Sequence, residues 1–129
     1  MNKKLYSRTA ATSLLLGLAM AASAQQTNFL SNNHCIYRVD HSQKVLLLPV
    51  QEKAEICNVK VIDGNSQVKA LNIRLASNHI DYYVPLYISE FKDSKNISLD
   101  IHVNGTYRND GGISGFTCWK NMKYADSFD

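Results

Sequence analysis

The chain has 129 residues, of which 45% are apolar and 19% are charged, a balance typical of one globular domain and too polar for a membrane protein. The net charge of +3 comes from 14 basic and 11 acidic residues, and three basic ones, Lys3, Lys4 and Arg8, lie within residues 1–24. Residues 25–129 therefore carry 11 basic and 11 acidic side chains. This neutrality argues against nucleic acid or an anionic membrane as a partner.

Residues 1–24 have the pattern of a secretory signal peptide. The cationic start is followed by an apolar stretch over 10–22, and the small residues at 22–24 suit a signal peptidase. The apolar stretch is shorter than the ~20 residues that a membrane-spanning helix needs. We therefore expect cleavage before Gln25, export to the periplasm or the cell surface, and no membrane insertion of the mature chain.

Residues 25–34 are polar and rich in Asn, which predicts a flexible lead-in. Short apolar runs begin at residue 35, and "CIYRV" (35–39) and "KVLLLPV" (44–50) predict the first two strands. The polar segment between these runs would suit a hairpin loop. Pro49 cannot donate a ladder hydrogen bond, so its end of the second strand should lie at a sheet edge or a bulge.

The segment 55–76 predicts a β-hairpin. Its Asp-Gly pair at 63–64 tolerates positive φ and separates two runs with β-branched residues. In the second run Leu71, Ile73 and Leu75 fall on one face, and the residues between them are polar. This period of two indicates a strand with one face in contact with solvent.

Two further runs, 80–88 and 97–103, repeat this period of two. In the second, Asp100 and His102 fall on the face opposite the apolar residues. A Gly-rich loop then leads to a last predicted strand, Phe116–Met122.

Short strands that each have one dry face need a second sheet to cover that face. The sequence therefore predicts an all-β fold, an antiparallel β-sandwich of about seven strands over residues 35–122.

The side chains that could carry chemistry form no catalytic or metal-ligand pattern in the sequence. Cys35, Cys57 and Cys118 lack the spacing of a zinc site, and we interpret them as small buried apolar residues. The sequence does not decide whether two of them form a disulfide. The four histidines also lack ligand spacing, so a solvated or core role is expected for each. They are His34, His41, His79 and His102. We predict no cofactor, no metal and no catalytic residue.

Sugar binding is easier to accommodate. Tyr83 and Tyr87 fall on one face of a predicted strand, roughly 13 Å apart, and aromatic rings on an exposed sheet can stack on sugars. The alternative is that this face packs on another domain or is only partly exposed. Trp119, the single tryptophan, suits the core or an interface better than a ligand platform.

Two stretches, "IDYYVPLYISEFKDSKNISLDIHV" and "CWKNMKYADSFD", carry a family resemblance over residues 36–129. They resemble the N-terminal β-sandwich domain of unknown function that precedes the catalytic domain in exported fructan hydrolases of Bacteroides-type bacteria. Those enzymes, levanases and inulinases among them, belong to glycoside hydrolase family 32. Tyr87 departs from the pattern, which has an Asp at this position.

The resemblance implies a five-bladed catalytic β-propeller as the partner, with residues 123–129 as the start of the linker to it. The family's nucleophile lies in a Trp-Met-Asn-Asp-Pro-Asn motif that this chain lacks, so we expect no activity from the chain alone. One interpretation is a non-catalytic accessory domain that contacts the propeller around Trp119 and Tyr124. The other is an exported carbohydrate-binding module that binds fructan through Tyr83 and Tyr87.

Overall fold

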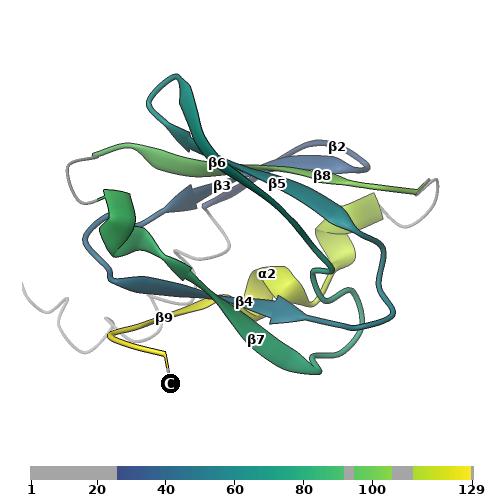
Figure 1. The fold of residues 1–129 in the computed structure, drawn as a ribbon. Coiled ribbons are helices and arrows are strands. Elements are labelled where there is room, and N and C mark those ends of the chain that lie inside the picture. The colour runs from purple at the N-terminus through teal and green to yellow at the C-terminus, as the bar shows by residue number, and fades with distance from the viewer. Residues whose placement is uncertain (1–25, 92–94, 106–111, 129) are drawn as a thin grey trace, which may run out of the picture.

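The computed structural model describes residues 26–91, 95–105 and 112–128, and the predicted signal peptide lies outside these ranges. Two antiparallel sheets of five and three strands form the layers of a sandwich (Figure 1). The predicted all-β sandwich is confirmed, with eight strands in the described residues in place of about seven. Within these ranges, no helix has the length and apolar composition needed to cross a membrane.

The five-stranded sheet has the strand order β2-β3-β8-β5-β6. These strands are β2 (Thr27–Ser31), β3 (His34–Val39), β8 (Ile97–Val103), β5 (Cys57–Asp63) and β6 (Ser66–Ile73). The three-stranded sheet has the order β7-β4-β9, with β7 (Tyr82–Tyr87), β4 (Val45–Val50) and β9 (Lys123–Ala125). Short helical turns follow β7 and precede β9. They are η2 (Ile88–Phe91), η3 (Gly112–Gly115) and α2 (Cys118–Asn121).

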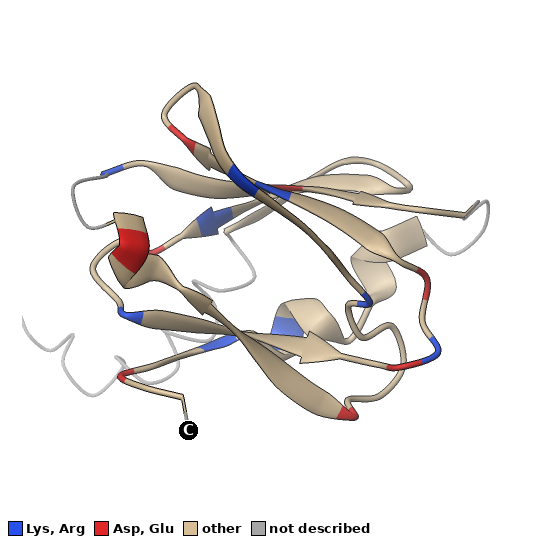
Figure 2. Cartoon of the chain, in the orientation of Figure 1, with Lys and Arg blue, Asp and Glu red and all other residues tan. Residues whose placement is uncertain are grey.

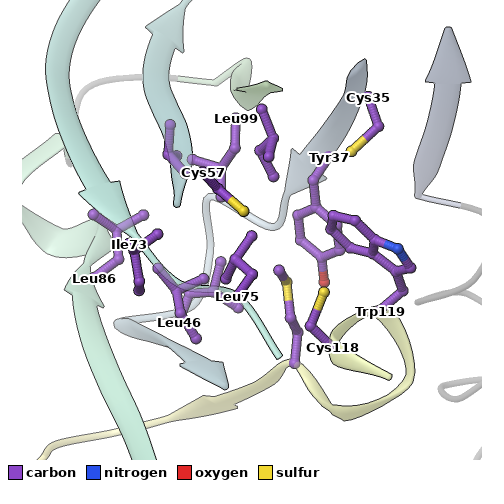
Figure 3. Close-up of a cluster of buried hydrophobic side chains, with 14 of the residues drawn as sticks. Cys35, Tyr37, Leu46, Cys57, Ile73, Leu75, Leu86, Leu99, Cys118 and Trp119 are labelled. Atoms are coloured by element: carbon purple, nitrogen blue, oxygen red, sulfur yellow. The ribbon is translucent and has the colours of Figure 1, made fainter. Parts of the chain in front are cut away.

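The core lies between the sheets, where the alternating residues of facing strands meet (Figure 3). β8 shows the pattern most clearly, because each of its predicted apolar residues is at most 2% exposed. These residues are Ile97, Leu99, Ile101 and Val103. The predicted dry and wet faces of this strand are therefore confirmed.

The predicted hairpin at 55–76 is confirmed as β5 and β6. The two strands pair antiparallel, and the turn between them contains Gly64 with φ of 63°. In its second arm Ile73 and Leu75 are buried, whereas Asn72 and Arg74 are exposed. The alternation seen in the sequence thus reports the side of β6 that faces the core.

Pro49 lies where β4 changes its partner on one side. β4 is the central strand of its sheet, and β9 pairs only with residues 45–47 of it. Beyond that point the Pro49 carbonyl accepts the Ala76 backbone N–H at 3.0 Å, and Val50 forms an isolated bridge with Leu75. This end of β4 is therefore not the free sheet edge that the sequence predicted. Proline is tolerated because its position falls in the gap between the two partners, where no N–H is needed for a ladder.

Three other local predictions were wrong. The lead-in at 25–34 contains β2, which pairs with β3 as an edge strand. β3 and β4 form no hairpin, because the loop between them crosses from one sheet to the other. Residues 116–122 contain the helical turn α2, and the last strand is β9, inside the segment expected to begin a linker.

These errors share a physical cause. The polar residues of β2 are acceptable because edge strands expose most of their side chains. The apolar spacing of residues 116–122 satisfies burial as one helical turn as well as it would as a strand. Tertiary contacts, such as the backbone bond from Cys118 N–H to the Ala76 carbonyl at 3.0 Å, decide between the two.

Candidate functional site

The outer surface of the three-stranded sheet is apolar and aromatic. We call it the β4/β7 face and define it by the residues of this sheet that alternate with the core residues: Val45, Leu47, Pro49, Tyr83, Pro85, Tyr87, Lys123 and Ala125. β4 and β7 contain no charged residue, so both strands are tan throughout in Figure 2. Val45 and Pro49 are buried within this face, whereas Tyr87 and Lys123 are exposed. The accessible part of the face is therefore mostly apolar, with one basic side chain, and is suited to contact with another molecule or domain.

Tyr83 and Tyr87 lie on this face, as the strand period predicts, but their surroundings differ. Tyr87 lies opposite Val45 and is 39% exposed. Tyr83 is half-buried, and the Nζ atom of Lys123 lies 4.5 Å from the centroid of its ring. This cation–π contact occupies one side of the Tyr83 ring. Tyr87 is therefore the more accessible of the two aromatic side chains.

Trp119 is buried in the core, and Tyr124 is partly buried against it. The Trp119 indole is 5% exposed, donates its Nε1–H to the Ile113 carbonyl at 2.6 Å, and meets the Phe29 ring edge-on. The Tyr124 hydroxyl accepts the Asp40 backbone N–H at 3.0 Å, and burial raises the pKa of this hydroxyl. An interdomain role for these two residues stays a prediction. Tyr124 has some accessible surface that a partner could contact directly, whereas Trp119 has almost none.

A cleft of about 680 Å³ opens where the edge strands β6 and β7 separate from one another. Tyr82 lines it and is 48% exposed, although the period of two predicts that Tyr82 faces the core. The reason is its position, because the start of β7 lies at the open edge of the sandwich, where no strand covers it. Arg74 also lines the cleft, and its guanidinium donates to the Ala54 carbonyl.

The outer surface of the five-stranded sheet carries a cluster of two histidines and an aspartate. His34 Nε2 lies 2.7 Å from Asp100 Oδ1, and His102 Nδ1 lies 3.6 Å from the same oxygen. The two imidazole rings stack with centroids 3.7 Å apart. Because β3 and β8 pair in register, His34 lies directly opposite His102. We call these three residues the His-Asp-His cluster.

Sequence reasoning missed this cluster, because its histidines are 68 positions apart and have no ligand spacing along the chain. One signal was available. Asp100 and His102 were expected on the same wet face of one strand, and a strand that pairs with it in register can add a third ligand. The partner strand and its register are tertiary information, so the position of His34 could not be read from the chain.

The three cysteines are buried free thiols, which confirms the interpretation as small apolar residues. Burial raises the pKa of Cys35 to about 12 and that of Cys57 to about 11, and it also raises the pKa of Cys118. Thiols with such pKa values stay protonated near neutral pH, and protonated thiols are poor nucleophiles and poor metal ligands.

Together these features define a small β-sandwich domain with one mostly apolar sheet face. Residues 31–129 match the domain of unknown function DUF4980, so the chain belongs to this family. No curated protein and no solved structure matches the chain.

Proposed function

We propose that this domain is a non-catalytic accessory domain of an exported fructan-degrading glycoside hydrolase of the family 32 type, and that its β4/β7 face docks on the catalytic β-propeller. The observation that carries the proposal is the composition of this face, where two tyrosines, Pro85 and Leu47 form an accessible surface free of charge along β4 and β7. Interfaces between domains need such a surface, because uncharged side chains lose little on desolvation.

The topology supports the same face. β9 is the third strand of this sheet and pairs with β4 as far as Ala125. A catalytic domain that follows in the same polypeptide would therefore be tethered at this sheet. Tethering raises the effective concentration of the partner, so a modest interface is sufficient to hold the two domains together.

A carbohydrate-binding module is the second candidate, and the exposure of Tyr87 favours it. A sugar that stacks on both tyrosines can use only the side of the Tyr83 ring that Lys123 leaves free. Docking of a domain has no such restriction, because an interface can retain the cation–π contact. For this reason we favour the accessory role.

The proposal is tested by titrating the full chain with a separately expressed family 32 β-propeller in a calorimeter. We expect saturable binding that weakens by at least ~10-fold in Tyr87→Asp, since a buried tyrosine in an interface contributes ~2 kcal/mol or more. Val68→Asp is the matched control, because Val68 is 45% exposed on β6, an edge strand of the other sheet. This control should bind like the wild type.

Affinity electrophoresis in levan and inulin gels separates the two candidates. Retardation that is lost in a Tyr83→Ala/Tyr87→Ala double variant, with no binding to the propeller, would support the carbohydrate-binding module in place of the accessory domain. Equal weakening of propeller binding by Tyr87→Asp and Val68→Asp would refute the assignment of the β4/β7 face.

A further inference from the structure

We propose that the His-Asp-His cluster is a binding site for a divalent transition-metal ion such as Zn²⁺, held by His34 Nε2, His102 Nδ1 and Asp100 Oδ1. All three residues project from the outer face of the five-stranded sheet, since their neighbours Cys35 and Ile101 are fully buried on the inner face. Two imidazoles and one carboxylate are a ligand set that suits zinc, copper, nickel and iron.

The distances fit one ion. The three ligand atoms lie within 4.8 Å of one another. Ligand atoms ~2.1 Å from a tetrahedral ion lie ~3.4 Å from each other. The distances of 2.7 Å and 3.6 Å from Asp100 Oδ1 to the two imidazole nitrogens lie on either side of this value. An ion can therefore replace the hydrogen bond between His34 and Asp100 with small rotations of side chains that are partly exposed.

The sheet already brings the ligands together before any ion binds. His34 and His102 are direct cross-strand neighbours, and Asp100 is two residues from His102 on the same face of β8. Such neighbours lie close in every antiparallel ladder, so little backbone order remains to be imposed by the ion. Binding should therefore be measurable without a change in secondary structure.

The cluster offers three protein ligands and is open to solvent. The side chains of His34, Asp100 and His102 are 24%, 28% and 48% exposed, respectively. Structural zinc sites have four protein ligands, so a three-ligand site leaves a position for water or for an oxygen of a bound molecule. Asn58 is the β5 residue opposite His102, so its amide lies beside the cluster in this row of the sheet.

One charged neighbour opposes the ion. Lys60 of β5 is directly opposite Asp100, which places a basic residue beside the carboxylate ligand. Like charges repel, so Lys60 should limit the affinity, and Lys60→Gln should tighten metal binding by a few-fold. This expected gain of affinity distinguishes a true site from a nonspecific effect of mutation.

The test uses the full chain without an affinity tag, titrated with Zn²⁺ by calorimetry and with Co²⁺ by visible absorption. We expect one equivalent to bind, with Co²⁺ bands of a site containing nitrogen and oxygen ligands. His102→Gln and His34→Gln should each weaken Zn²⁺ binding by at least ~10-fold. His102 is the more exposed of the two, so its variant keeps the test valid if His34→Gln does not fold.

His79→Gln is the matched control. His79 Nε2 lies 3.2 Å from Asp81 Oδ1, so this exposed pair has the same chemistry with one ligand fewer. The control should bind Zn²⁺ like the wild type. Failure of the wild type to bind, or equal losses in His102→Gln and His79→Gln, would overturn the proposal. The test needs no propeller or fructan, so its result is independent of the proposed accessory role.

Discussion

Gln51 provides the sharpest test of how the two sheets are joined. Its side chain is only 7% exposed and follows β4 directly, while residues 74–81 cross from β6 to β7. Its Oε1 atom accepts the backbone N–H groups of three successive residues, Ser77, Asn78 and His79, at 3.1, 2.8 and 3.2 Å. One amide oxygen therefore fixes the loop that positions β7 and the β4/β7 face.

The informative substitution is Gln51→Met, which keeps the length and volume of the side chain and removes the acceptor. Each of the three bonds contributes ~1 kcal/mol net. Asn78 and His79 are exposed, so water compensates in part, and we expect a loss of about 2 kcal/mol. That is a large fraction of the ~5–15 kcal/mol typical of a domain, and it corresponds to a fall in Tm of roughly 10 °C.

Urea denaturation followed by tryptophan fluorescence measures the change, since Trp119 is buried in the folded state. Gln67→Met is the control, because Gln67 is exposed on β6, and its effect should stay within ~0.5 kcal/mol. A loss below ~0.5 kcal/mol in Gln51→Met would refute the idea that this side chain holds the connection between the sheets.

Three further predictions concern the buried cysteines and two glycines. Because burial raises the pKa values of Cys35 and Cys57 to about 12 and about 11, and that of Cys118 as well, a thiol reagent at pH 8 should label the folded protein slowly and the urea-unfolded protein completely. The raised pKa values also make the free energy of unfolding depend on pH. The contribution of the buried thiols to stability is fully present below pH 9, and it is lost as the pH rises toward 11–12 because the unfolded chain loses these protons more easily. Urea titrations at pH 8, 9.5 and 11 should therefore show falling stability, and constant stability would contradict the burial of the thiols. Gly112→Ala should cost at least ~2 kcal/mol in urea denaturation, because φ is 65° and the new Cβ would lie 2.4 Å from a backbone oxygen of the β2–β3 turn, whereas Gly64→Ala, with open space around it, should cost only ~1 kcal/mol. Equal losses in the two glycine variants would contradict the close approach at Gly112.

The features that the sequence predicts well are local. The period of two at residues 71–75 and in β8 and the Asp-Gly turn depend on neighbours within a few residues, and the structure confirms all three. The interior role of the cysteines also follows from residue type, because a small apolar side chain is favourable in a core of either sheet.

The features that the sequence does not predict depend on pairing between distant segments. β2 has no dry face of its own and is a strand because β3 offers its edge. The assignment of β3 and β4 to different sheets cannot be seen in either strand, since both carry buried apolar residues. The His-Asp-His cluster is missed for the same reason, because it exists only in the register of β3 on β8.

The accessory role through the β4/β7 face is tested most directly by hydroxyl-radical footprinting of the full chain, alone and with a saturating family 32 β-propeller. We predict that oxidation of Tyr87, Pro85 and Leu47 falls in the complex, while oxidation of Val68 and His102 on the other sheet stays the same. Unchanged oxidation of the β4/β7 face, or protection of Val68 and His102 in its place, would contradict the proposed docking surface.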